Sequence, residues 1–130
     1  MMQIYGPRFG NASSAHSGGE EARGALAQAR ASVARLLNVD SEQILFTSSG
    51  TEANNMALVS GLKPRAGSPL ITSSIEHSSI IKMAEHLDGT GTNVIYLHPS
   101  RSGRIRVEDV EQAISQYRPA LVSIQWVNSE

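Results

Sequence analysis

The chain has 130 residues, with 11 Lys and Arg against 12 Asp and Glu, and its formal net charge is -1. Such a balance offers no basic surface, so nucleic acid and anionic membranes are not expected as partners. The sequence has no cysteine, which excludes disulfides, thiolate metal sites and a cysteine nucleophile within these residues. No apolar run reaches the roughly 18 residues of a membrane helix, and residues 1–10 lack the apolar core of a signal peptide. We therefore expect a cytoplasmic protein.

The first predicted element is a long amphipathic helix between Ser17 and Asn38. Small and apolar residues recur from Ala22 to Leu37 with the three- and four-residue spacing of one helix face. Ser17 and Glu20 have the spacing of a capping box, and Asn38 is a suitable stop.

Strands and helices alternate along the rest of the chain. Apolar, β-prone runs predict strands at residues 44–47, 69–73, 93–97 and 121–127, with helical spacing between them. Trp126 shares a face of the last predicted strand with apolar neighbours, which favours a core position. Strands joined by helical crossovers run parallel when they share a sheet. We therefore predict an α/β fold with a mainly parallel sheet, helices on both faces, and a single segment over residues 1–130.

Candidate ligand-binding groups follow two of these strands, at the sheet edge where open α/β folds bind ligands. Gly50 and Thr51 open a helix after the first strand, where free N–H groups and a hydroxyl suit a phosphate. Alternatively, Ser49 and Glu52 have capping-box spacing and only cap that helix, which spacing alone favours. His77 follows the second strand and either stacks on a ring and moves protons, or only caps the next helix.

Other common sites lack support in the sequence. Neither a G-x-x-x-x-G-K-[ST] loop nor a G-x-G-x-x-G turn occurs, so a kinase or a dehydrogenase is unsupported. The remaining histidines, His16, His86 and His98, do not have metal-ligand spacing, and no metal site is predicted.

Three segments taken together carry a family resemblance: FGNASSAH at 9–16, FTSSGTEANN at 46–55 and TSSIEH at 72–77. In this order they resemble cysteine desulfurases, pyridoxal-phosphate enzymes of the class V aminotransferase group, and the likeness continues to Glu130. It implies a segment of the cofactor-binding large domain. The complete enzyme would convert L-cysteine to L-alanine and pass sulfur to an enzyme cysteine for iron-sulfur cluster or thio-cofactor assembly. It further implies a sulfur-acceptor protein as a partner. The predicted sheet leaves an open edge, so we also expect a homo-oligomer.

The resemblance also assigns roles to individual residues. It implies that Gly50 and Thr51 hold the phosphate of pyridoxal 5'-phosphate. His77 would stack on the pyridine ring and assist proton transfer, as the catalytic residue of this segment. Ser129 stands where the family pattern Asn-Asn-Glu has its second Asn, and its hydroxyl has less reach toward the cofactor than an amide.

The same resemblance predicts that the isolated chain is inactive. The family's Schiff-base lysine, ring-nitrogen aspartate, substrate arginine and sulfur-accepting cysteine are not among these residues, and neither Lys63 nor Lys82 matches that lysine. Two alternatives stay open. One is a non-catalytic scaffold that pairs with another polypeptide through an open sheet edge. The other is a parent enzyme that acts on selenocysteine.

Overall fold

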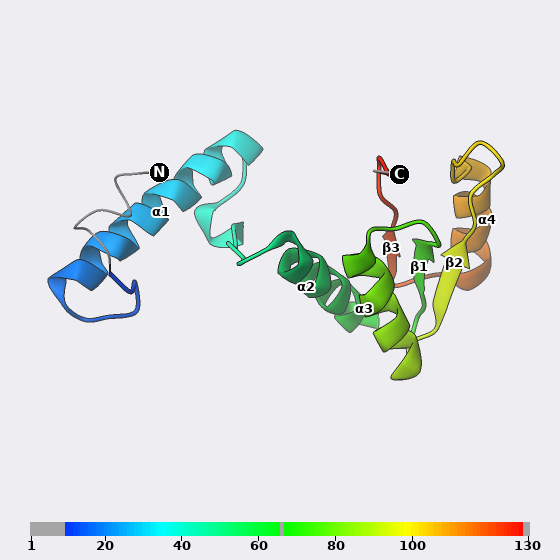
Figure 1. The fold of residues 1–130 in the computed structure, drawn as a ribbon, viewed down its shortest axis with the longest axis horizontal. Helices are drawn as coiled ribbons and strands as arrows, with labels where there is room; N and C mark the ends of the chain where they lie inside the picture. The colour runs from blue at the N-terminus through cyan, green and yellow to red at the C-terminus, as the bar shows by residue number, and fades with distance from the viewer. Residues whose placement is uncertain (1–9, 66, 129–130) are drawn as a thin grey trace. The chain divides into compact units, whose positions relative to one another are not determined.

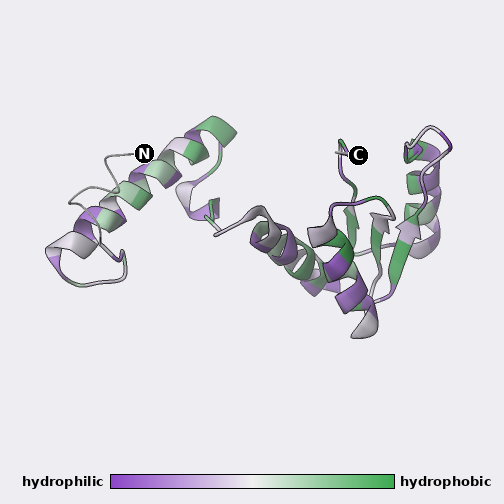
Figure 2. Cartoon of the chain, in the orientation of Figure 1, coloured by the Kyte–Doolittle hydropathy of each residue, from purple (hydrophilic) through white to green (hydrophobic). Residues whose placement is uncertain are grey.

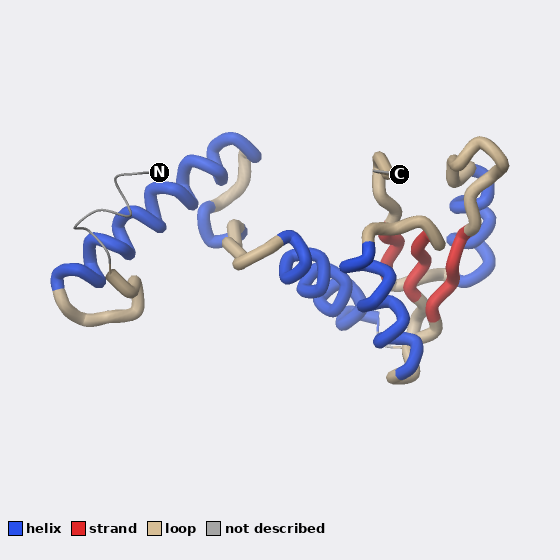
Figure 3. Tube along the Cα trace, in the orientation of Figure 1, coloured by secondary structure: helices blue, strands red, loops and turns tan. Residues whose placement is uncertain are grey.

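The structure is a computed structural model that describes residues 10–65 and 67–128. The chain divides into two compact units, Met1–Phe46 and Thr47–Glu130 (Figure 1). The first unit holds α1 (Ser17–Leu37) and a short 3-10 helix, η1 (Ser41–Gln43). The second holds α2 (Gly50–Leu62), η2 (Lys63–Arg65), β1 (Leu70–Ser73), α3 (Ser78–Gly89), β2 (Val94–Leu97), α4 (Val107–Tyr117) and β3 (Leu121–Ser123) (Figure 3).

Helix α1 ends at the residue that the sequence predicts, but its N-cap differs from the prediction. Asn38 is the C-cap, with a left-handed φ of 54°, a conformation that asparagine tolerates better than most residues. The N-cap is His16, whose carbonyl accepts the N–H of Gly19 at 2.9 Å, and none of the described side chains caps this end. The predicted capping box of Ser17 and Glu20 is therefore wrong, because the chain already turns one residue earlier.

The apolar residues of α1 are largely exposed within the described part of the chain. Leu36 is 83% exposed and Leu26 39%, whereas Ala34 is buried. Figure 2 shows polar and apolar residues distributed along this helix. The periodicity thus predicts the helix correctly, but the first unit does not bury its leucines.

In the part of the chain that the structure describes, three parallel strands form the sheet, in the order β2-β1-β3. β1 lies in the centre and all four of its residues are buried. The chain passes from β1 to β2 through α3, and then returns through α4 to β3 on the other side of β1. Right-handed crossovers in opposite directions place their helices on opposite faces, and Figure 1 shows α2 and α3 on one side with α4 on the other. The α/β prediction is confirmed.

The predicted strand at 44–47 is wrong. None of these residues pairs with a strand among the residues that the structure describes. The carbonyl of Ile44 instead accepts a hydrogen bond from Arg30 Nε at 3.0 Å, and the same guanidinium lies 5.8 Å from the centroid of the Phe46 ring. An extended apolar run becomes a strand only when a neighbouring strand takes its backbone groups, and here α1 supplies the partner.

The last strand is shorter than predicted, and the prediction that Trp126 lies in the core is wrong. β3 ends at Ser123, and the N–H of Gln125 bonds to the carboxylate of Glu76 instead of to a strand. The alternation of faces ends with the strand, so it no longer determines where Trp126 points. Its side chain is 98% exposed.

The core of the second unit lies between the sheet and the helix pair α2 and α3. Its buried residues are Leu58, Leu70, Ile80, Ala84 and Val94. α2 approaches β3 closely at Gly61, where an added Cβ would lie 2.9 Å from Leu121 Cδ2. This packing fixes the starts of α2 and α3, which carry the candidate site. Within the described ranges, no helix is both long enough and apolar enough to cross a membrane.

Candidate functional site

The start of α2 is shaped by its cap. Ser49 is the N-cap: its Oγ accepts the N–H of Glu52 at 3.2 Å, and its carbonyl accepts the N–H of Ala53 at 3.1 Å. The sequence therefore predicted this helix start correctly. The cap uses only some of the free N–H groups of the first turn. Those of Gly50 and Thr51 have no acceptor among the described residues.

The second half of the predicted capping box takes a different form. The carboxylate of Glu52 accepts both the N–H and the hydroxyl of Ser48, each at 2.7 Å, rather than the N–H of Ser49. These two hydrogen bonds, the hydroxyl first, hold the pKa of Glu52 below its ordinary value although burial opposes them. The ionised carboxylate thus fastens the loop before α2 and leaves the donors of Gly50 and Thr51 available.

The Glu52 contact should be visible in a pH titration. The pKa of Glu52 is lower in the folded chain than its ordinary value. The contact therefore stabilises the loop at pH values above the ordinary pKa, and this stabilisation is lost as the pH falls through the pKa of the folded chain. Ser48→Ala removes the larger cause, so the pKa of Glu52 should rise toward its ordinary 4.5. NMR titration of the Glu52 side-chain carbonyl measures this change. Ser102→Ala, in an exposed turn, should leave the pKa where it is, and an equal shift in both variants contradicts the assignment.

The front of α2 is open. An added Cβ on Gly50 would meet nothing within 4 Å, and both Gly50 and Thr51 are exposed. No close contact within the described chain therefore requires a glycine at position 50. Two N–H donors and a hydroxyl at a positive helix end fit a phosphate group.

His77 lies at the start of the neighbouring helix. It is the N-cap of α3, and its Nδ1 accepts the N–H of Ser79 at 3.2 Å and lies 2.8 Å from Ser79 Oγ. Asn54 Nδ2, on α2, donates to the same Oγ at 2.8 Å. The structure therefore links His77 to the helix of Gly50 and Thr51 through the packing of α2 on α3. The sequence analysis placed both groups after strands, but residues 44–47 before α2 do not pair with any described strand.

Sequence reasoning missed Asn54 and Ser79. Asn54 belongs to one of the resembling segments, but its partner lies 25 residues further along the chain. No local spacing signals a contact between two helices at that separation.

Glu76, the residue before His77, was also missed. Its carboxylate accepts the hydroxyl of Ser73 at 2.5 Å and the N–H of Gln125 at 3.0 Å. The carbonyl of Ile75 accepts from Gln125 Nε2 and, at 2.9 Å, from Asn128 Nδ2. The segment after β3 is therefore fastened to the segment that presents His77. Ser129 lies outside the described residues.

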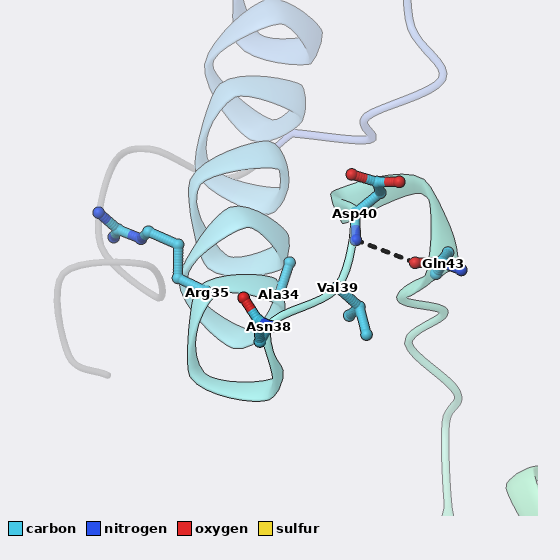
Figure 4. A pocket seen from close by; sticks show the side chains of 6 residues that line it. All are labelled: Ala34, Arg35, Asn38, Val39, Asp40 and Gln43. Atoms are coloured by element: carbon cyan, nitrogen blue, oxygen red, sulfur yellow. Dashed lines mark hydrogen bonds between the residues drawn. The ribbon is translucent and has the colours of Figure 1, made fainter.

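Each of the two units contains a cavity. A hollow of about 400 Å³ lies in the first unit at the end of α1, where the N–H of Asp40 donates to Gln43 Oε1 at 3.0 Å (Figure 4). In the second unit, a cavity of about 670 Å³ is lined by residues from the ends of β1 and β3, including Ser73 and Gln125. Neither is lined by Gly50, Thr51 or His77. In residues 10–65 and 67–128, no three His, Asp or Glu side chains gather as metal ligands.

The chain matches known proteins along its whole length. The family model for class-V aminotransferases matches residues 1–130. A cysteine desulfurase of Bradyrhizobium diazoefficiens is 39% identical over 132 residues, which cover all of this chain and 33% of that protein. The solved structure of a NifS-like protein matches 98% of this chain and 35% of its own, with a TM-score of 0.83 and 30% identity. That of SspA in complex with cysteine matches 95% and 36%, with a TM-score of 0.78 and 36% identity.

These matches share one feature: the chain spans about a third of the length of the curated relatives that it matches. The family match covers every residue of this chain, and the resemblance found in the sequence is confirmed. The chain belongs to the class-V aminotransferase family.

Proposed function

We propose that this chain supplies the cofactor-phosphate site and the ring-facing histidine of a pyridoxal-phosphate-dependent cysteine desulfurase. The observation that carries the proposal is the open start of α2, joined through Asn54 and Ser79 to His77. The matched relative from Bradyrhizobium is named cysteine desulfurase, and SspA was solved with cysteine. L-cysteine as the substrate is accordingly part of the proposal.

The residues present fit the phosphate end of the cofactor that this family uses. Gly50 and Thr51 would hold the phosphate through N–H groups that the described chain leaves without an acceptor. Pyridoxal phosphate supplies an electron sink when bound. His77 offers an exposed imidazole that would bind the ring and hold a proton. Ser129 is proposed as a further cofactor contact.

The two lysines of this chain do not supply the other groups that the reaction needs. Lys63 follows the last residue of α2, about 20 Å from Gly50 by the helical rise, and Lys82 is an exposed residue of α3. The sequence contains no cysteine to accept sulfur. We expect no sulfide from L-cysteine with the purified 130-residue chain, above a protein-free control.

The phosphate site can be tested by calorimetric titration with pyridoxine 5'-phosphate, which has no aldehyde to react with lysines. Binding should be saturable and should weaken on competition with inorganic phosphate. Thr51→Ala removes one hydrogen bond to a charged group, so its Kd should rise about 10- to 100-fold. Thr90→Ala, at the other end of α3, is the matched control and should leave the Kd unchanged. An unaltered Kd in Thr51→Ala contradicts the site.

The alternative is a scaffold that pairs with another polypeptide. Two observations favour it: β2 and β3 each have one edge unpaired among the described strands, and Trp126 is 98% exposed. A chain that binds neither pyridoxine 5'-phosphate nor inorganic phosphate would support this alternative. Homo-oligomer formation, a sulfur-acceptor partner, a selenocysteine substrate, a cytoplasmic location and a single large-domain segment remain predictions.

A further inference from the structure

We propose that Ser79 is a positioning residue, which together with Asn54 holds His77 in the tautomer that carries its proton on Nε2. This role rests on the proposed function, in which His77 is the residue that faces the cofactor ring. The tautomer itself depends only on contacts within this chain.

Counting donors determines where the proton lies. The N–H of Ser79 can only donate, and it points at His77 Nδ1 at 3.2 Å. Nδ1 must therefore be the nitrogen without a proton. Asn54 Nδ2 donates to one of the two lone pairs of Ser79 Oγ at 2.8 Å. Because Nδ1 carries no proton, the Ser79 hydroxyl is the donor in its contact with Nδ1, also at 2.8 Å.

Burial makes this arrangement effective. Ser79 is 7% exposed and Asn54 is half-buried, so water competes weakly for their hydrogen bonds. Asn54 lies three residues after Thr51 on α2, about one helical turn. The ring of His77 is thus held by the same helix end that would bind the phosphate, and its Nε2–H is the group left for a ligand.

The test is the nitrogen-15 NMR spectrum of the histidine side chains, at a pH about two units above the usual histidine pKa of about 6.5. In the full chain, Nδ1 of His77 should give the signal of an unprotonated nitrogen and Nε2 that of a protonated one. His77→Gln assigns the signals. The reverse pattern overturns the proposal.

Variants on both helices separate positioning from a structural role. Ser79→Ala and Asn54→Ala should each move the two nitrogen signals of His77 toward each other, while Ser79→Thr keeps the hydroxyl and the original pattern. The shift should be partial because the N–H of residue 79 remains. Unchanged signals in both alanine variants overturn the proposal, and since they lie on different helices, failure of one to fold leaves the other to decide.

The chain supplies a matched control. Ser74 Oγ lies 3.1 Å from His98 Nδ1, a second serine–histidine contact away from α2. Ser74→Ala should alter the signals of His98 and leave those of His77 in place. A response of His77 to this variant as large as that to Ser79→Ala overturns the specific role of Ser79. Because no cofactor is added, a correct tautomer without phosphate binding contradicts only the proposed function, and the opposite result contradicts only this inference.

Discussion

Leu70→Ala should lower the free energy of unfolding of the second unit by about 3 kcal/mol, within the 2–5 kcal/mol typical of buried leucines. Leu70 lies in the central strand β1, is 0% exposed and packs in the cluster with Leu58, Ile80 and Val94. Alanine lacks the buried methyl groups of leucine and would leave a cavity. β1 cannot move to fill this cavity because it is paired with a strand on each side. Chemical denaturation followed by far-UV circular dichroism measures the loss.

The matched control for this change is Leu36→Ala. Leu36 is 83% exposed on α1, so the same truncation removes little buried surface and should change stability by less than about 0.5 kcal/mol. Fluorescence is a poor probe of either variant because Trp126, the single tryptophan, is already exposed. Equal losses in the two variants would show that Leu70 is not part of the core.

Glu76→Ala should have the second largest effect, about 2–3 kcal/mol, because two donors lose a charged acceptor. The hydroxyl of Ser73, a fully buried residue, and the N–H of Gln125 both bond to this carboxylate. Their loss should also free the segment that presents His77. Hydrogen exchange at the Gln125 amide measures the local opening, and denaturation measures the global loss.

Glu111→Ala is the control for the charge. Glu111 is exposed on α4, and its removal changes the net charge by the same amount without touching β1 or β3. Exchange at Gln125 should be slow in this variant and fast in Glu76→Ala. Slow exchange in both would mean that the Glu76 carboxylate does not hold the two segments together.

Leu70→Ala and Glu76→Ala both bear on the candidate site, because they change the residues that hold it in place and not the groups that would bind the ligand. Leu70 belongs to the core that sets α2 against α3, and Glu76 fixes the chain next to His77. A loss of pyridoxine 5'-phosphate binding in Leu70→Ala or Glu76→Ala would thus have a different origin from the loss in Thr51→Ala. Circular dichroism separates the two causes, because Thr51→Ala should keep the native spectrum.

Local chemistry in the sequence was enough for much of this protein. Asn38 ends α1 because asparagine tolerates a positive φ, and Ser49 starts α2 because its hydroxyl accepts a helix N–H. The alternation of strands and helices gave a parallel α/β sheet. The segments containing Gly50, Thr51 and His77 gave the family, because their order along the chain is a property of the sequence itself.

Tertiary structure decided the features that depend on distant partners. Residues 44–47 were expected as a strand, but Arg30 on α1 takes the carbonyl of Ile44. Trp126 was expected in the core, but β3 ends three residues before it, where Glu76 takes the N–H of Gln125. A backbone group bonds to whichever partner the fold brings near, and apolar periodicity does not contain that information.

The same limit applies to the candidate site. The sequence determined which groups could bind a phosphate or move a proton, because those abilities belong to a helix start and to an imidazole. Only the packing of α2 against α3 brought Asn54 to Ser79 and so joined the helix of Thr51 to His77. Hydrogen bonds act over about 3 Å, and residues 25 apart in the chain reach that distance only in the folded protein.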